Sequence, residues 1–465
     1  MNSGNEAFMT NFAPENKKND MRLVILVLAM AGMVFSSGAQ QKMTLQECLK
    51  TGIENNLGLK KADGEIRKGK LTISENRAKL LPQINMVASL NDNFDPPVSV
   101  TDGTAYGKKY NITKTLQYNS AAGVQLQMPL YNQMALTAMD LAKTVDRINS
   151  LSYEKAVEDL IMQISKMYYM AQNTEEQIAI VGDNIKRLKE LRDITVAFYD
   201  NDMAIEVDVK RVNINIENMQ VQYDNAKAML VQQYNMLKYV MDYPSDADIA
   251  VVTDGNGIDE ISSFAGLDSN LYELQLLQEQ VTLAQQQKDL AKSEYLPSLA
   301  LTGSLMFSAY TDKIGNWFHS GESNHWYRSS GLGISLRVPI FDGFGRRSKV
   351  RKAQIDIDNA KISYEDAYKG LQTQYMNAIN DLQNSQRNYV KQKDNYKLAE
   401  DVYNVTTDRY REGIVTMTDV LQDEMQLSSA QNNYLSASYN YRIARLSILK
   451  YTGQLSTLLG EAPRR

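Results

Sequence analysis

The sequence predicts a mixed α/β membrane protein, internally duplicated, with two β-hairpins and several long coiled-coil α-helices in one chain. Three observations predict this fold class. Proline-marked segments recur in the same order in both halves of the chain. Short stretches alternate apolar and polar residues, and long stretches lack proline and keep a seven-residue apolar repeat.

The chain opens with a candidate secretory signal peptide over residues 1–39. Arg22 precedes the apolar run LVILVLAMAGMVF, and the small residues Ser37 and Ala39 are placed for cleavage after Ala39. This run is too short for a transmembrane helix, which needs about 20 residues, and no later stretch is apolar enough. Because Met21 would give a more ordinary start, residues 1–20 are interpreted as a candidate upstream extension. We therefore expect export, and any membrane span must be β.

Composition argues against several classes of function. The net charge of −5 speaks against nucleic acid as the main partner, which would favour a basic surface. The single cysteine, Cys48, cannot form an intramolecular disulfide or join a cysteine metal site. The two histidines, His319 and His325, are interpreted as surface residues because no cysteine accompanies them. The sequence predicts no metal site, no catalytic residue and no cofactor.

Three landmarks mark the duplication. Pro82 corresponds to Pro297, Pro129 corresponds to Pro339, and the segment FYDNDMAIEVDV corresponds to RYREGIVTMTDV, at offsets of 215, 210 and 211 residues. An ordered set of this kind indicates internal duplication. The predicted parts are a first repeat over 43–243, a linking segment over 244–266, a second repeat over 267–455 and a short tail over 456–465.

Each repeat is expected to begin with a helix, over 45–79 and 268–293. Two alternating strands then follow, over 83–91 and 122–130 in the first repeat and 298–307 and 332–340 in the second. The intervening loops are expected at 93–119 and 309–329. The strands are about as long as a tilted membrane-spanning strand requires.

The alternation predicts which way the side chains of the last strand point. Leu332, Ile334, Leu336 and Val338 are expected to face lipid, and Arg337 is expected to face a wet lumen together with Ser335. Aromatic residues near the loops would suit a membrane interface. A half-buried sheet of a soluble protein shows the same alternation, so this alternative stays open on pattern alone. The strand-to-helix junctions are expected at Pro129, Pro339 and Gly343.

Four strands are too few for a closed barrel, because known transmembrane barrels begin at about eight strands. A lipid-exposed sheet cannot leave unpaired edges in hydrocarbon. The membrane interpretation therefore requires an oligomer that pools its strands.

The long helices are predicted from segments that lack proline, 131–243 and 346–412. A helix of the second length would span roughly 100 Å. Gly413 suits a left-handed position that ends it, and Thr416 with Asp419 suits a capping box that starts the return helix. In the first repeat Ile205 replaces the capping threonine. The seven-residue seam, interpreted as packing in a left-handed supercoil, consists of Tyr368, Tyr375, Leu382, Tyr389, Tyr396, Tyr403 and Tyr410, with Val157, Ile164, Ala171, Ile178 and Ile185 in the first repeat.

The ordered duplicate set, the VPIFDG junction and the YREGIVTMTDVLQ turn resemble the TolC-type outer membrane efflux proteins over about 43–455. The resemblance implies a homotrimer with a 12-stranded β-barrel in the outer membrane lipid of a Gram-negative bacterium, above an α-helical barrel in the periplasm. It implies a belt formed partly by 244–266. It also implies a passive exit duct for a tripartite efflux or type I secretion system. The implied partners are a periplasmic adaptor (membrane fusion) protein and an inner-membrane pump, proton-driven or of the ABC type.

The resemblance further implies an acidic constriction at the periplasmic tip. Asp419 matches its first acidic position, Gln422 stands at the second with Asp423 beside it, and Asp208 is the equivalent in the first repeat. Gly413 and Thr416 belong to the same turn. Val415 replaces an arginine that the family's gate would use. The alternative role of each acid is to stabilise a helix N-terminus.

Two other functions compete with this one. The segment GFGRRS, residues 343–348, resembles part of a dinucleotide-binding loop, but it lacks the third glycine and no βαβ unit follows. An enzyme is therefore not expected. A soluble periplasmic coiled-coil scaffold or adaptor would share the seven-residue repeat but needs no duplicated strands. Fractionation separates the scaffold from the duct, because a scaffold would leave with the periplasmic contents.

Overall fold

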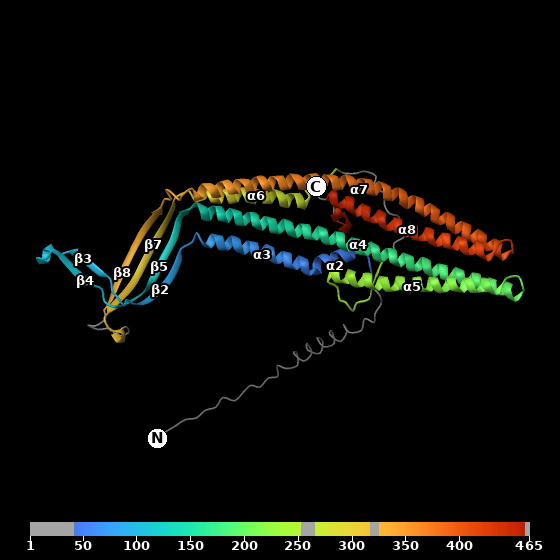
Figure 1. Ribbon diagram of the computed structural model, residues 1–465, viewed down its shortest axis with the longest axis horizontal. Helices are drawn as coiled ribbons and strands as arrows, with labels where there is room; N and C mark the ends of the chain where they lie inside the picture. The colour runs from blue at the N-terminus through green and yellow to red at the C-terminus, as the bar shows by residue number, and fades with distance from the viewer. Residues whose placement is uncertain (1–40, 253–265, 317–324, 461–465) are drawn as a thin grey trace, which may run out of the picture. The chain divides into compact units, whose positions relative to one another are not determined.

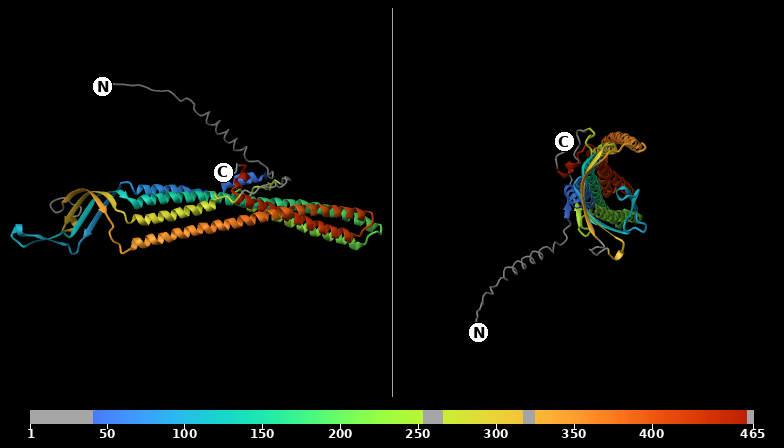
Figure 2. Two further views of the ribbon diagram at one scale, coloured as in Figure 1. Left: turned by 90° about the horizontal axis from the view of Figure 1, so that it is seen from above. Right: turned by 90° about the vertical axis from the view of Figure 1, so that its left-hand side faces the viewer.

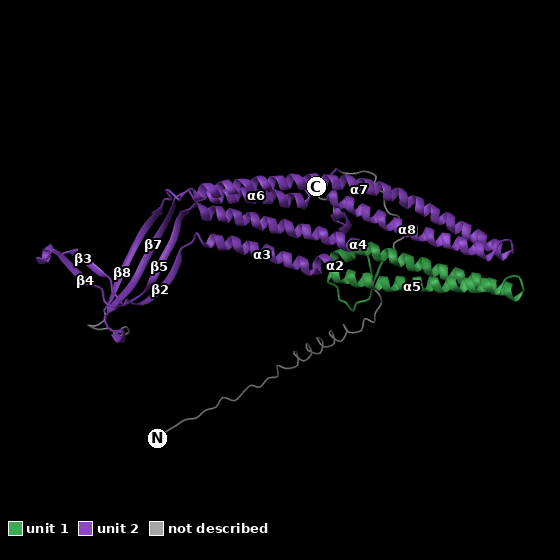
Figure 3. Ribbon diagram, viewed as in Figure 1, with its two compact units in different colours: residues 1–51, 167–256 green, residues 52–166, 257–465 purple. Residues whose placement is uncertain are grey.

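A computed structural model describes residues 41–252, 266–316 and 325–460. By contacts the chain forms two compact units (Figure 3). Unit 1 holds residues 1–51 and 167–256, and unit 2 holds 52–166 and 257–465. The predicted signal peptide and His319 lie outside the described residues. Within the described ranges, no helix is both long enough and apolar enough to cross a membrane.

Unit 2 contains a four-stranded antiparallel sheet in the order β2-β5-β7-β8 (Figure 1). The predicted hairpins are confirmed, since β2 pairs with β5 and β7 pairs with β8, while β5 and β7 join the two repeats. Strands β2 and β8 are the two edges of the sheet. The strands are β2 Gln83–Asp92, β5 Tyr118–Asn132, β7 Ser298–Thr311 and β8 Trp326–Arg337.

The predicted loops are too long. Strand β5 starts at Tyr118, β7 continues to Thr311 and β8 starts at Trp326. The first loop also contains a separate antiparallel hairpin, β3 Val98–Asp102 with β4 Tyr110–Lys114, joined through the 3-10 turn η1 Thr104–Tyr106. Its strands of five residues are too short for alternation to distinguish them from a polar loop.

The predicted end of β8 is also wrong. The strand stops at Arg337, before Val338 and Pro339, whereas the alternation predicts that it reaches residue 340. Proline has no N–H to donate to a ladder, so pairing ends ahead of it. Pro129, by contrast, lies inside β5, and the register shifts between Pro129 and Tyr131, so that the strand continues to Asn132 through an irregularity.

The strand register confirms the two-faced pattern. Leu301 pairs with Ile334 on one side and Met128 on the other. The next residue, Thr302, pairs with Gly333 and Gln127. Because neighbouring residues along a strand point to opposite faces, most large apolar residues share one face of the sheet and most polar residues share the other.

The longest helix that lies wholly in unit 2 is α7. Helix α7 has 67 residues, which corresponds to roughly 100 Å at the usual helical rise. It packs against α6 and then against α8, and Figures 1 and 2 show these neighbours along its length. The helices are α3 Leu57–Ala78, α6 Tyr272–Ser293, α7 Gly345–Arg411, α8 Met417–Tyr451 and the 3-10 helix η3 Leu455–Leu459.

Both predicted leading helices need correction. The expected helix over 45–79 is two helices, because Asn56 interrupts it and its side-chain oxygen accepts a hydrogen bond from the Leu59 N–H at 3.1 Å. Asparagine favours such caps over helix interiors. The second leading helix starts at Tyr272, four residues later than the expected residue 268.

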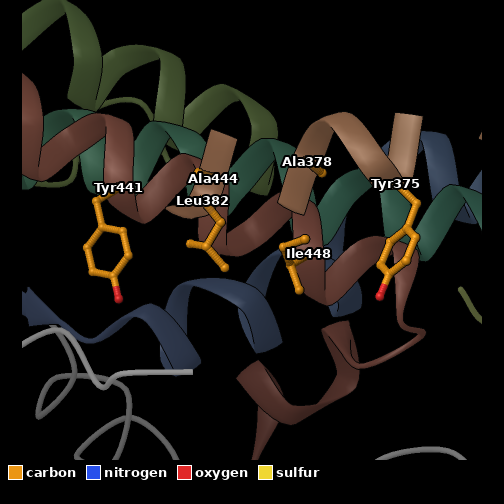
Figure 4. Packing of buried hydrophobic residues seen from close by; sticks show 6 residues of the cluster. All are labelled: Tyr375, Ala378, Leu382, Tyr441, Ala444 and Ile448. Carbon is orange, nitrogen blue, oxygen red and sulfur yellow. The ribbon is translucent and has the colours of Figure 1, made fainter. Parts of the chain in front are cut away.

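The seven-residue seam forms the contact between α7 and α8. Tyr375 and Leu382 of α7 pack with Tyr441 and Ile448 of α8 in one buried cluster (Figure 4). Tyr389 stacks on the Tyr441 ring with 5.7 Å between ring centroids. Most of the tyrosine stripe is therefore packing, as predicted, and Tyr403 and Tyr410 continue it as buried residues. Tyr368 departs from the prediction, because its side chain is 41% exposed.

Unit 1 holds a short parallel pair of strands, β1 Gln41–Met43 with β6 Ile249–Val251, against two helices. The helices are α5 Glu206–Met241 and the second part of α4 Gln133–Asp200; α2 Leu45–Asn55 and α4 each run through both units. The Tyr168 hydroxyl lies 3.3 Å from the Met43 carbonyl oxygen and 3.1 Å from that of Val252.

Candidate channel wall, junction and tip

The polar face of the four-stranded sheet forms a shallow cavity of about 380 Å³. Its polar lining consists of uncharged amide and hydroxyl side chains and of glycines. These residues are Asn85, Gln125, Gln127, Thr302, Ser304, Gly331 and Gly333. Such a surface can be wetted without attracting either sign of charge, which suits the wall of a water-filled passage.

Arg337 lies on this polar face, and its position in a wet lumen stays a prediction. It is exposed and pairs in register with Ser298, two residues along from the Ser335–Ala300 pair. The opposite face carries large exposed apolar side chains at Ile84, Met86, Leu332 and Ile334, which are 69%, 79%, 76% and 68% exposed. These fractions mark a face that needs an apolar environment.

Arg346 organises the junction between β8 and α7. It is buried, and its Nε donates to Asp342 Oδ2 at 2.9 Å while its backbone N–H donates to the same oxygen at 2.8 Å. Its Nη1 lies 3.3 Å from the carbonyl oxygens of both Glu294 and Pro339, and its guanidinium sits 4.9 Å from the Tyr295 ring centroid. One side chain thus ties together the end of α6, the segment after β8 and the start of α7.

The junction backbone needs two left-handed residues. Gly343 has φ 66° and Phe344 has φ 68°. Glycine adopts this region freely, whereas a bulky side chain rarely does. The Arg346 side-chain and backbone hydrogen bonds lower the pKa of Asp342, so this carboxylate stays ionised as the acceptor at neutral pH.

The first-repeat junction is built more simply. Asn132 Oδ1 accepts a hydrogen bond from the Ala135 N–H at 3.2 Å and so supports the first turn of α4. At the position equivalent to Arg346, 210 residues earlier, stands Leu136, which has no polar group to offer. The junction predicted at Pro129 is therefore displaced, because β5 continues to Asn132 and α4 starts at Gln133. Pro339 and Gly343 lie between β8 and α7, as the sequence predicted, and an arginine secures this second junction alone.

The turn between α7 and α8 is a candidate tip. Gly413 has φ 75°, and the Thr416 hydroxyl and backbone N–H both bond to Asp419 Oδ2, at 2.7 and 2.9 Å. The Asp419 N–H returns a bond to the Thr416 hydroxyl, which completes the capping box. These bonds, with the Thr416 side chain as the largest cause, lower the pKa of Asp419. Its carboxylate is therefore charged at neutral pH.

The other tip residues of the second repeat differ in setting. Gln422 is exposed, whereas Asp423 is half-buried. The Oδ2 of Asp423 accepts a hydrogen bond from the Thr406 hydroxyl at 2.7 Å. Glu424 is buried. Asp423 thus links α8 back to α7 behind the capping box.

The first-repeat turn belongs to unit 1. Asp202 has φ 61°, the left-handed conformation found for Gly413 in the second repeat. Ile205 precedes α5 without a side-chain cap, as predicted. Asp208 is half-buried, and its Oδ1 lies 3.4 Å from Arg211 Nη1. The structure places Asp208 and Asp419 in corresponding first turns of two helices in different units.

Sequence reasoning missed the Arg346 cluster and the anchoring of β1 and β6. Arg346 follows Asp342 by four residues, and this pair of opposite charges just before and within the predicted helix start could have marked the contact. Tyr234 bonds to Glu175 and to the Val251 N–H, and nothing in the sequence pattern marks those contacts because the partners are far apart in the chain. Among the described residues, no group of three or more His, Cys, Asp or Glu side chains is arranged to hold a metal ion.

Comparison with known proteins agrees with this architecture. The family model for outer membrane efflux proteins matches residues 49–241 and 261–454. The chain is 22% identical to outer membrane protein TolC of Escherichia coli, covering 93% of this chain and 86% of that protein. TolC of Vibrio cholerae is 23% identical, with coverages of 83% and 84%.

A solved structure shows the same fold. The outer membrane protein VceC of Vibrio cholerae superposes with a TM-score of 0.69 at 14% identity, covering 88% of this chain and 96% of VceC. The relatives are channel proteins, and TolC-type channels form trimers that work in tripartite efflux and secretion systems. The chain belongs to the outer membrane efflux protein family and is an outer membrane channel protein of the TolC type.

Proposed function

We propose that three copies of this chain form the outer membrane exit duct of a tripartite efflux or type I secretion system. In this proposal residues 1–39 direct export, a periplasmic adaptor and an inner-membrane pump open the tip, and the duct itself consumes no energy. The observation that carries the proposal is the four-stranded sheet with two unpaired edges, β2 and β8, and one exposed apolar face.

That sheet is incomplete as a membrane structure. Every backbone group in hydrocarbon needs a partner, and each unsatisfied group costs several kcal/mol. Pairing β2 of one protomer with β8 of the next removes both edges, and three protomers then supply twelve strands. The exposed apolar side chains of Ile84, Met86, Leu332 and Ile334 meet lipid, while the polar face lines the passage.

The closed end of the duct is proposed at the helical turns. In a trimer, Asp419 would contribute three carboxylates to one level of the channel, with Gln422 and Asp423 beside it and Asp208 supplying the first-repeat level. The lowered pKa of Asp419 supports a charged constriction. Its capping bonds serve α8 at the same time, so the two roles coexist. Val415 leaves the gate without the arginine that the family resemblance led us to expect.

The cargo belongs to the attached pump rather than to the duct. Relatives include the alkaline protease secretion protein AprF of Pseudomonas aeruginosa and the probable outer membrane lipoprotein SilC of Salmonella typhimurium. The name of AprF refers to secretion of a protein, whereas the name of SilC gives no substrate. These relatives therefore assign no single substrate class to this chain.

Single-channel recording in planar bilayers tests the proposal. The native protein should form channels of low conductance, and Asp419→Asn should raise that conductance because it removes the charges at the constriction. Thr416→Ala is the matched control, since it breaks the capping box but keeps the Asp419 charge. Equal conductance in native and Asp419→Asn channels would remove Asp419 from the gate, and a native protein that forms no channel would refute the duct itself.

A further inference from the structure

We propose that Arg337 forms a ring of three positive charges at the inner end of the β-barrel, and that this ring favours anions over cations in the passage. The inference rests on the trimeric duct proposed above. It adds a determinant of charge selectivity that is separate from the acidic tip.

Arg337 stands at a defined level of the sheet. It is the last residue of β8 and pairs with Ser298, the first residue of β7. Both ends connect directly to helices, β7 through the segment after α6 and β8 through the segment before α7. Arg337 therefore lies on the helix-side end of the polar face, where the barrel passes into the helical part of the duct.

Charge is rare on the four strands. Within β2, β5, β7 and β8 the charged residues are Asp92, Arg328 and Arg337. Arg328 pairs with Phe307 and Asp92 pairs with Tyr118, both on the apolar face. On the polar face of these strands, Arg337 is consequently the single charged side chain.

Nearby acids do not neutralise Arg337 in the part of the chain that the structure describes. Both Glu294 carboxylate oxygens accept from Lys349 Nζ at 2.8 Å. Asp342 accepts from Arg346 Nε at 2.9 Å. Arg337 is exposed and makes no ion pair with a described residue, so its charge is available to ions in the lumen.

Rings of arginine or lysine are how pores favour anions. A guanidinium remains charged at any physiological pH. At 0.1 M salt its field extends about 10 Å, so the ring acts on ions that pass its own level and not on the distant tip. The uncharged wall of Asn85, Gln125 and Thr302 does not oppose it.

The test is the reversal potential of the purified full-length protein in planar bilayers under a KCl gradient. We expect Arg337→Gln to raise the potassium-to-chloride permeability ratio about twofold at roughly 0.1 M salt, as loss of three screened charges predicts. Arg337→Lys should keep the native ratio. Arg328→Gln is the matched control, because it removes an arginine from the same strand but from the opposite face, and it should leave the ratio unchanged.

The outcomes separate the inference from the proposed function. Channels that conduct but show the same permeability ratio in native, Arg337→Gln and Arg337→Lys proteins overturn the arginine ring and leave the duct standing. An equal shift from Arg328→Gln overturns it as well. Absence of any channel in the native protein refutes the duct, and the ring with it.

Discussion

Thr416 and Asp419 cap the start of α8 reciprocally, the hydroxyl lying 2.7 Å from the carboxylate and the Asp419 N–H 3.4 Å from the hydroxyl. Thr416→Ala should therefore weaken the first turn of α8 by about 1 kcal/mol, the usual cost of losing such a cap. Amide hydrogen exchange of that turn should accelerate roughly fivefold.

The first repeat offers the reverse experiment. Ile205 holds the equivalent position before α5 and makes no side-chain cap, although Asp208 follows three residues later. Ile205→Thr should complete a capping box there and slow amide exchange in the first turn of α5 by a similar factor. Suppose that Thr416→Ala speeds amide exchange at the start of α8 but Ile205→Thr does not slow it at the start of α5. The two repeats would then not be equivalent at their helix caps.

Gly413 and Asp202 give a second pair of predictions. Both are left-handed, and the residue after each donates its N–H to a carbonyl five residues earlier, Ile414 to Arg409 at 2.9 Å and Met203 to Phe198 at 2.8 Å. A side chain in this conformation costs about 1 kcal/mol compared with glycine. Gly413→Ala should speed limited proteolysis at its turn, and Asp202→Gly should leave the fold intact with the Asp202 turn less strained. Unchanged cleavage in Gly413→Ala would contradict the strain assigned to that site.

Arg346 should be a stability determinant of the β8–α7 junction. Arg346→Met keeps much of the side-chain volume and the backbone N–H bond to Asp342, but it removes the side-chain donor to Asp342 and to two carbonyl oxygens, at a cost of about 1–3 kcal/mol. The variant should dissociate or unfold at a lower temperature in detergent. Arg347→Met is the control, because Arg347 is exposed and no contact is assigned to it. An equal loss of thermal stability in Arg346→Met and Arg347→Met would show that the positive charge, and not the buried contacts of Arg346, stabilises the junction.

Glu175 should give unit 1 a pH dependence. Burial raises the pKa of Glu175 above its ordinary value of 4.5, and Tyr234, whose own pKa is also raised by burial, bonds to it. The hydrogen bond from Tyr234, and then the charge of Lys42, partly offset this rise in the pKa of Glu175. A raised carboxyl pKa means that the protonated form favours the folded state, so this contribution is complete below about pH 4.5 and is lost as the pH rises through the folded-state pKa.

Glu175→Gln should therefore flatten the decline in thermal stability of unit 1 as the pH rises from about 4.5 to 7. Glu158→Gln serves as a control for removing a carboxylate from the same helix outside unit 1. A native protein whose unit 1 becomes more stable over this pH range would contradict the assigned direction.

Much of this fold could be predicted from the sequence because local rules determine it. The strand faces follow from a period of two, α7 and α8 follow from unbroken seven-residue spacing, and the Thr416 cap follows from its partner three residues on. The β3–β4 hairpin was missed because its strands are short. The break at Asn56 was missed because asparagine also occurs within helices.

The candidate site divides in the same way. The left-handed φ of Gly413, the Thr416 cap and the sheet face of Arg337 could be predicted because backbone conformation, capping and strand parity are local properties. Their roles at a gate or in a lumen stay predictions. The contacts of Arg346 with Glu294 and Tyr295, and those of Tyr234 with Glu175, depend on which distant segments meet. Pattern alone carries no information about such pairings.

The central claim is that chains pool their strands into one closed barrel, and its most direct test is the mass of the native protein extracted in mild detergent. Light scattering coupled to size exclusion, corrected for detergent, should give three chains per particle. A folded monomer would contradict the account.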